Sequence, residues 1–116
     1  MAVQTYQLIM RSGPNPDSVY PLERNEIYVG RDISNDIAVN DGEISRKHAR
    51  LTLQGNTYMV EDLGSTNGTF VDGQRLLGPH TLRPGELIMF GENVGMLFEA
   101  VVYDPNATVI APGHPV

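Results

Sequence analysis

Tight-turn dipeptides that separate short apolar runs are the feature that most constrains the fold of this 116-residue chain. Gly next to Asn or Asp favours the two-residue turns of β-hairpins, and Pro-Gly is a further turn signal. No run has the periodicity of an amphipathic helix, so the sequence predicts an all-β protein. The dipeptides are Gly55-Asn56, Asn67-Gly68, Asp72-Gly73 and Pro84-Gly85.

The apolar runs between these turns predict about ten to eleven short strands in a twisted antiparallel β-sandwich. In the run 49–54, Leu51 and Leu53 fall on one face, as in a strand with one buried side. Pro21 cannot donate to a central ladder, so residues 19–22 are expected at the edge of a sheet. Nine of the expected strands can be assigned to residues: 6–10, 19–22, 26–30, 37–39, 49–54, 57–62, 69–71, 86–90 and 94–102.

The composition indicates one domain followed by a short tail. The length suits a single hydrophobic core, which is expected within residues 1–102. Residues 103–116 are rich in Pro and Gly and are expected to form a flexible tail. The chain has no Cys, which excludes a disulfide framework or thiolate metal site. Neither a secretory signal nor an apolar run of bilayer length occurs, so the expectation is a cytoplasmic protein that does not enter a membrane.

The distribution of charge points away from nucleic acids and toward one cationic region. A formal net charge of −6 argues against a nucleic-acid partner, because such a partner demands a basic surface. Arg31, Arg46, Lys47 and Arg50 nevertheless fall close together, and an acidic chain that gathers cations is expected to use them locally. For Lys47 and Arg50, a solvated strand edge is the expectation.

Hydrogen-bond donors of several kinds recur at turn positions between residues 30 and 73. Arg31 supplies a planar guanidinium fork that suits bidentate binding. Ser45 and Thr66 supply hydroxyl groups, and Asn67 supplies a carboxamide. Charge-assisted and neutral donors that converge from loops make a site for a phosphate group.

These residues, in this order and approximate spacing, resemble the forkhead-associated (FHA) domain, a binding module for phosphothreonine peptides. The resemblance covers residues 5–102 and implies an FHA/SMAD-like fold, two twisted sheets with the binding loops together at one end. It also implies a non-catalytic role in serine/threonine kinase signalling. The motifs that carry it are Gly30-Arg31, Asn35-Asp36-Ile37, Ser45-Arg46-Lys47-His48 and Gly64-Ser65-Thr66-Asn67-Gly68-Thr69-Phe70.

The resemblance implies a role for each candidate phosphopeptide-binding residue. Arg31, Ser45 and Thr66 would surround the phosphothreonine. Arg46, at a position where the family also carries Asn, would add charge to the phosphate or contact the peptide backbone. Asn67 would hydrogen-bond the peptide backbone beside the phosphoresidue.

Other residues of the motifs are expected to support the binding loops. The family's equivalent of His48 is a buried residue that hydrogen-bonds these loops. The remaining supporting residues permit or stabilise the turns. They are Gly30, Gly64, Ser65 and Gly68.

Simpler interpretations exist for several of these residues. Arg31 could be a surface residue paired with Asp32 or Asp36. Ser45 could merely cap a turn, and Asn67 stands in an ordinary Asn-Gly hairpin turn.

Catalysis and metal binding have little support in the sequence. Ser45, His48 and Asp62 contain the residue types of a hydrolase triad, but no Gly-x-Ser-x-Gly nucleophile turn occurs. Two of the three His lie outside the motif region, and no EF-hand order of acidic residues is present. The expectation is therefore no enzyme, no metal site and no cofactor.

The expected partner is a phosphothreonine-containing protein or peptide, with a serine/threonine protein kinase acting upstream. An alternative is an FHA-fold domain that recruits its partner without phosphate. Thr108 in the tail is a candidate phosphorylation site, because some bacterial FHA proteins bind their own phosphorylated terminal threonine; an unmodified tail residue is the simpler interpretation. The unphosphorylated chain is expected to be a monomer.

Overall fold

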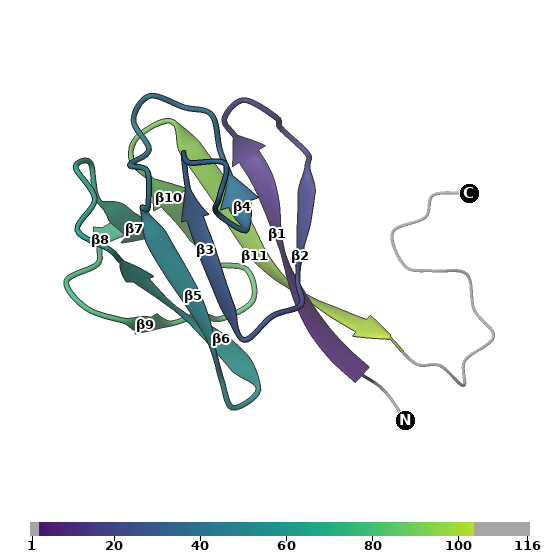
Figure 1. Ribbon diagram of the computed structural model, residues 1–116. Helices are drawn as coiled ribbons and strands as arrows, with labels where there is room; N and C mark the ends of the chain where they lie inside the picture. Colours follow the sequence, from purple (N-terminus) through teal and green to yellow (C-terminus); the bar gives the residue numbers. More distant parts are fainter. Residues whose placement is uncertain (1–2, 104–116) are drawn as a thin grey trace.

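The computed structural model describes residues 3–103, which form a sandwich of two β-sheets (Figure 1). The six-stranded sheet has the order β2-β1-β11-β10-β7-β8, and the five-stranded sheet has the order β4-β3-β5-β6-β9. The predicted all-β sandwich is confirmed. The strands are β1 (Val3–Ser12), β2 (Val19–Leu22), β3 (Glu26–Gly30), β4 (Ile37–Ala38), β5 (Ala49–Gln54), β6 (Thr57–Asp62), β7 (Thr69–Val71), β8 (Gln74–Arg75), β9 (His80–Thr81), β10 (Leu87–Phe90) and β11 (Val94–Tyr103).

Two features of the sheets differ from the sequence prediction. The strands β8 and β9 were not expected, because their residues are polar and lie in no apolar run. Each lies at the edge of its sheet. In addition, β4 pairs with β3 in parallel, with Val29 opposite Ile37, so the five-stranded sheet is mixed rather than purely antiparallel.

The local expectations for β2, β5 and β6 are confirmed. Strand β2 is an edge strand in which Pro21 lies opposite Gln7 of β1. Strands β5 and β6 form a hairpin around Gly55 and Asn56, and Gly55 has a φ of 62°, as the first residue of a type II′ turn requires. The alternation fails only at the end of β5, where Leu53 is exposed.

The core lies between the two sheets, and both contribute side chains to it. Tyr6 of β1 stacks on Phe98 of β11 with ring centroids 5.0 Å apart. The Tyr6 ring also packs edge to face with Tyr58 of the opposite sheet, with ring centroids 6.0 Å apart. Burial of these large rings accounts for a substantial part of the hydrophobic stabilisation.

Three polar residues are buried among those described, and all three lie at the same end of the sandwich: Asn35, His48 and Thr69. The register places the last residues of β3 and β6 beside the first residue of β5, since Val29 is opposite Ala49 and Ala49 is opposite Asp62. The β3–β4 loop (31–36), the β4–β5 loop (39–48) and the β6–β7 loop (63–68) therefore meet at this end. Strand β1 begins and strand β11 ends at the other (Figure 1).

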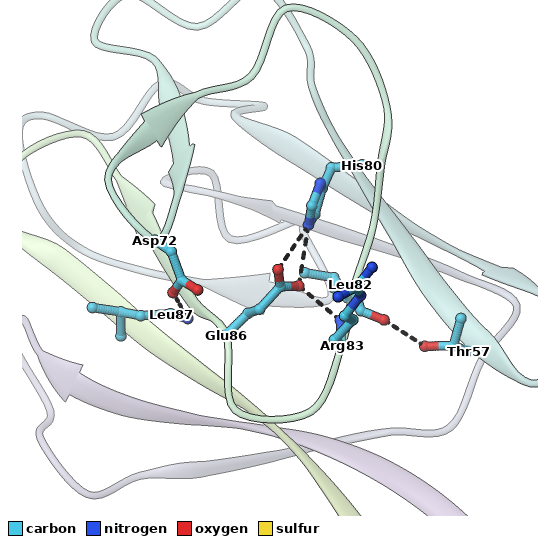
Figure 2. Close-up of polar contacts among 7 residues, drawn as sticks. All are labelled: Thr57, Asp72, His80, Leu82, Arg83, Glu86 and Leu87. Carbon is cyan, nitrogen blue, oxygen red and sulfur yellow. Dashed lines mark hydrogen bonds and ion pairs between the residues drawn. The ribbon is translucent and has the colours of Figure 1, made fainter.

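The loop that joins β9 to β10 lies away from these three loops (Figure 1). It has polar contacts of its own (Figure 2). Each oxygen of the Glu86 carboxylate lies 3.1 Å from Nε2 of His80. The carboxylate also accepts the backbone N–H of Arg83 at 2.7 Å. Asp72 accepts the backbone N–H of Leu87 at 2.8 Å. These two carboxylates are therefore already used within the domain.

Candidate functional site

The β3–β4 and β4–β5 loops touch through their backbones at Gly30. A Cβ atom on Gly30 would lie 2.1 Å from the carbonyl oxygen of Arg46, so no other residue fits there without moving the loop. The backbone N–H of Arg31 donates to the Ser45 carbonyl at 3.0 Å, and that of Asp32 donates to the Arg46 carbonyl at 3.3 Å. Arg31, Ser45 and Arg46 are thus brought together by backbone contacts.

Asn35 holds the same two loops together from inside. Its side-chain amide donates to the carbonyl oxygens of Asp32 at 2.8 Å and Arg46 at 2.7 Å. Only 7% of Asn35 is exposed, so replacing it would remove a buried side-chain hydrogen bond from each of these carbonyls. Asn35 belongs to the sequence pattern above, but nothing in the sequence assigned it this role.

His48 connects the β4–β5 loop to the β6–β7 loop. The backbone N–H of Ser45 donates to Nδ1 of His48 at 3.1 Å, so Nδ1 carries no proton. The proton is on Nε2, which donates to the carbonyl oxygen of Gly68 at 2.8 Å. The side chain is fully buried, and this burial lowers the pKa of His48 below its ordinary value, which favours the neutral ring.

Asp62, at the end of β6, organises the β6–β7 loop. Its carboxylate accepts the backbone N–H groups of Gly64 and Ser65, each at 3.0 Å. It also accepts the hydroxyl groups of Ser65 at 2.5 Å and Thr69 at 2.7 Å. Burial raises the pKa of the Asp62 carboxyl, but these hydrogen bonds outweigh burial and hold the pKa below its usual value. The sequence had suggested Asp62 only as a member of a triad.

The β6–β7 loop also contacts the β4–β5 loop through its candidate binding residues. The backbone N–H of Thr66 donates to the Ser45 hydroxyl oxygen at 3.0 Å, which leaves the hydroxyl proton of Ser45 free to serve as a donor. The Asn67 amide donates to the Glu43 carbonyl at 2.8 Å. That bond uses one of the two N–H groups of Asn67, so its other N–H remains as a donor.

The two arginines of the site carry charge without a partner of their own. Arg31 and Arg46 are exposed, and within residues 3–103 neither forms an ion pair. Asp36, a possible partner for Arg31, instead accepts hydrogen bonds from Arg24 at 3.0 Å and from the Tyr28 backbone at 2.8 Å. Two cationic residues therefore adjoin Ser45, Arg46 as its neighbour in the sequence and Arg31 through the backbone hydrogen bond.

The other two basic residues of the region point to a different surface. The Lys47 ammonium lies 5.0 Å from the centroid of the Tyr28 ring, within the range of a cation–π contact. Arg50 forms ion pairs with Glu61 and Glu26 across neighbouring strands. Because β5 is the central strand of its sheet, Arg50 lies on a sheet face and not at the predicted strand edge.

The geometry does not support a catalytic triad. Both ring nitrogens of His48 bond to backbone groups, one of them the N–H of Ser45 rather than its hydroxyl. The carboxylate of Asp62 bonds to its own loop. His48 therefore has no nitrogen free to activate Ser45 as a nucleophile.

Other kinds of site have no support in the described part of the chain. Within residues 3–103, no group of three or more acidic, His or Cys side chains is arranged to hold a metal ion. The same residues form no helix that is long and apolar enough to cross a membrane. Thr108 lies outside the described residues.

The site is a set of rigid loops that present donors and positive charge at one end of a β-sandwich. Such an arrangement of donors and charge on loops is typical of recognition domains for anionic ligands. A family model for the FHA domain matches residues 27–91, and the chain belongs to this family.

Three similar proteins illustrate the match. The glycogen accumulation regulator GarA of Mycolicibacterium smegmatis is 38% identical over 65 residues, which cover 56% of this chain and 41% of that protein. The chain thus spans less than half the length of that curated relative. The FHA domain of an Arabidopsis thaliana hypothetical protein has 29% identity and a TM-score of 0.81, covering 90% of this chain and 92% of that one. Mycobacterium tuberculosis EmbR, solved in complex with a low-affinity phosphopeptide, has 28% identity and a TM-score of 0.74, covering 82% of this chain and 24% of that one.

Proposed function

We propose that this domain binds phosphothreonine-containing peptides reversibly and without catalysis. The observation that carries the proposal is that two exposed arginines, Arg31 and Arg46, adjoin Ser45, whose hydroxyl proton is available. A phosphothreonine brings close to two negative charges and several acceptor oxygens, which match these donors. Membership of the FHA family and the phosphopeptide complex of the relative EmbR support the same ligand class.

The proposed roles divide the site into a phosphate part and a backbone part. Arg31 binds phosphate oxygens through its planar fork, and Ser45 donates its hydroxyl proton to the same group. Thr66 lines the pocket around the threonine methyl group, while Arg46 adds charge at the rim. Asn67 uses its remaining amide hydrogen to bind the peptide backbone next to the phosphoresidue.

Rigidity of the loops favours binding that needs little rearrangement. The hydrogen bonds of His48, Asn35 and Asp62 hold the donors in place before any ligand arrives. A site organised in advance loses less conformational entropy on binding, which leaves more of the interaction energy for affinity.

The proposed contacts between charged side chains and phosphate also imply that the affinity falls as the salt concentration rises, because salt screens exposed charges.

Titration calorimetry with matched peptides tests the proposal. A degenerate phosphothreonine library first selects a ligand, and the selected sequence is then synthesised with and without its phosphate. The phosphorylated peptide is expected to bind with micromolar affinity and the unphosphorylated peptide not to bind measurably. Equal affinity for both peptides would reject phosphate recognition.

Phosphate-independent recruitment through the same fold is the second candidate function. It would leave Arg31 without a ligand, although this guanidinium has no ion-pair partner within residues 3–103. Phosphate recognition explains that feature, so we favour it.

The proposal places the domain downstream of a serine/threonine protein kinase, which would create the ligand. It includes a cytoplasmic setting and a monomeric state while the chain itself is unphosphorylated. Sedimentation of the unmodified protein over a range of concentrations tests the oligomeric part.

A further inference from the structure

Arg75, in the two-residue strand β8, lies directly beside the candidate binding loops. A Cβ atom on Gly68 would be 3.0 Å from Nε and 3.1 Å from Cζ of Arg75, so the guanidinium rests against the Gly68 backbone. Gly68 follows Asn67, the residue proposed to hold the ligand backbone. A side chain at position 68 would displace the guanidinium, although the φ of 87° is the stronger reason for Gly at this position.

The position of Arg75 is set by the β7–β8 hairpin. Its Cα is paired with that of Phe70 across the two strands, and its Cζ lies 5.9 Å from the centroid of the Phe70 ring. Asp72 and Gly73 form the turn, both with positive φ, which suits a two-residue type I′ hairpin of defined register. The hairpin and the ring together hold the guanidinium beside the β6–β7 loop.

Arg75 has no carboxylate of its own to bind. Within residues 3–103 it forms no ion pair, whereas Arg24 and Arg50 both do. Asp72 and Glu86 line the same surface hollow as Arg75. Both carboxylates instead accept the hydrogen bonds already described, from Leu87 and from His80 and Arg83 (Figure 2).

We propose that Arg75 is a specificity-determining residue that binds an acidic side chain of the ligand close to the phosphothreonine. The inference rests on the proposed function and adds a preference to it. The guanidinium rests against Gly68, next to the residue proposed to hold the ligand backbone, so it is placed for side chains that flank the phosphothreonine. It lies beyond Gly68 on the flank of the loop, while Ser45 contacts the loop at Thr66, so Arg75 serves a neighbouring residue of the ligand and not the phosphate.

The test scans Asp through each position around phosphothreonine in an alanine-flanked peptide and measures affinity at low salt. The wild-type domain is expected to prefer Asp over Ala at one or two positions by about fivefold, the upper range for an exposed ion pair. Arg75→Ala is expected to lose that preference and still bind the alanine-flanked phosphopeptide. Arg75→Glu is expected to reverse it in favour of Lys at the same position.

Arg83 provides a matched control, because it is also exposed and without an ion pair within residues 3–103 but lies in the β9–β10 loop and not beside the binding loops. Arg83→Ala is expected to keep the wild-type Asp profile. Phosphopeptide binding with identical profiles in wild type and both Arg75 variants would overturn this inference alone. A uniform loss of affinity for all phosphopeptides in Arg75→Ala would instead assign the residue to the phosphate and also overturn it. Failure of the wild-type domain to distinguish phosphorylated from unphosphorylated peptide would reject the proposed function, and this inference with it.

Discussion

Nε2 of His48 donates a hydrogen bond to the carbonyl oxygen of Gly68 at 2.8 Å, and this contact joins two loops that are distant in the sequence. The same carbonyl accepts the backbone N–H of Gly91 at 2.9 Å, so the β10–β11 turn is joined to the loop as well. The opposite ring nitrogen of His48 is occupied by the N–H of Ser45. A neutral imidazole therefore sets the separation between the two loops that carry Ser45 and Thr66.

Replacing His48 by Ala is expected to lower the free energy of unfolding by about 1–3 kcal/mol, because the Ser45 N–H loses its partner and the Gly68 carbonyl loses one of two. Thermal unfolding measures the effect. Phosphopeptide affinity should fall with it, since the separation of the loops is no longer set by the ring.

The wild-type protein should also lose stability as the pH falls below about 6.5, because the unfolded chain then takes up a proton that the buried ring, with its lowered pKa, resists.

The His48→Ala protein should lack this step in stability near pH 6. Loss of stability from Asp62, whose pKa is also lowered, belongs to more acidic solution near or below pH 4 and should remain in the variant. Identical stability profiles for both proteins between pH 7.5 and 5 would show that His48 is not held neutral by the fold.

Arg31→Ala is expected to abolish measurable phosphopeptide binding while the domain stays folded. Removing one member of a desolvated charge pair costs about 2–5 kcal/mol, enough to erase a micromolar interaction. Arg31→Lys should also bind poorly, because the ammonium group lacks the bidentate geometry. Calorimetry measures binding. Arg83→Ala serves as the control, because it has the same net charge as Arg31→Ala. Wild-type affinity in folded Arg31→Ala would remove Arg31 from the site.

The same peptide should bind more tightly with phosphothreonine than with phosphoserine. The ligands differ by one methyl group, and an apolar pocket distinguishes a methyl by about 1–3 kcal/mol. The loop that carries Thr66 is tied to Ser45 and to Asp62, so the pocket beside it cannot readily collapse around the smaller ligand. Equal dissociation constants by calorimetry would contradict the proposed methyl pocket.

Gly30→Ala is expected to destabilise the domain by about 1–3 kcal/mol or more, because the added Cβ would overlap the carbonyl oxygen of Arg46. The loops must separate to admit it, so phosphopeptide binding should weaken as well. Gly78→Ala is the matched control: a Cβ there meets nothing within 4 Å, and Gly78 is not in the positive-φ region. Thermal unfolding of both variants provides the comparison. Equal melting temperatures would contradict the close approach.

Phosphorylation of Thr108 is expected to cause self-association, with the modified residue of one molecule bound by the site of another. Strand β11 begins beside the loops and extends for ten residues, about 30 Å, before it ends at Tyr103. The five residues from Tyr103 to Thr108 can span at most about 18 Å, which is too short to return to the same site. Light scattering should show mass increasing with concentration, and Arg31→Ala should abolish the increase. A monomeric phosphoprotein at all concentrations would exclude this mode.

Much of the fold could be predicted from the sequence, because it depends on the local chemistry of neighbouring residues. The turn dipeptides, the alternating burial of β5 and the edge position of β2 each depend on residues close in sequence. Glycine at a turn is selected by its own φ, and Pro21 by its missing N–H, so neither requires knowledge of the rest of the chain. The family pattern likewise placed the candidate binding residues in order, although their binding roles stay predictions.

Tertiary structure alone decided which residues touch and why they are needed. Gly30 is required by a carbonyl group of another loop, and Asn35 binds a residue eleven positions away. The tautomer of His48 depends on Ser45 and on Gly68 together, and the short strand β8 places Arg75 against Gly68. These contacts arise where loops from separate strands converge through space, whereas the sequence signals of strands and turns report only the conformation of neighbouring residues.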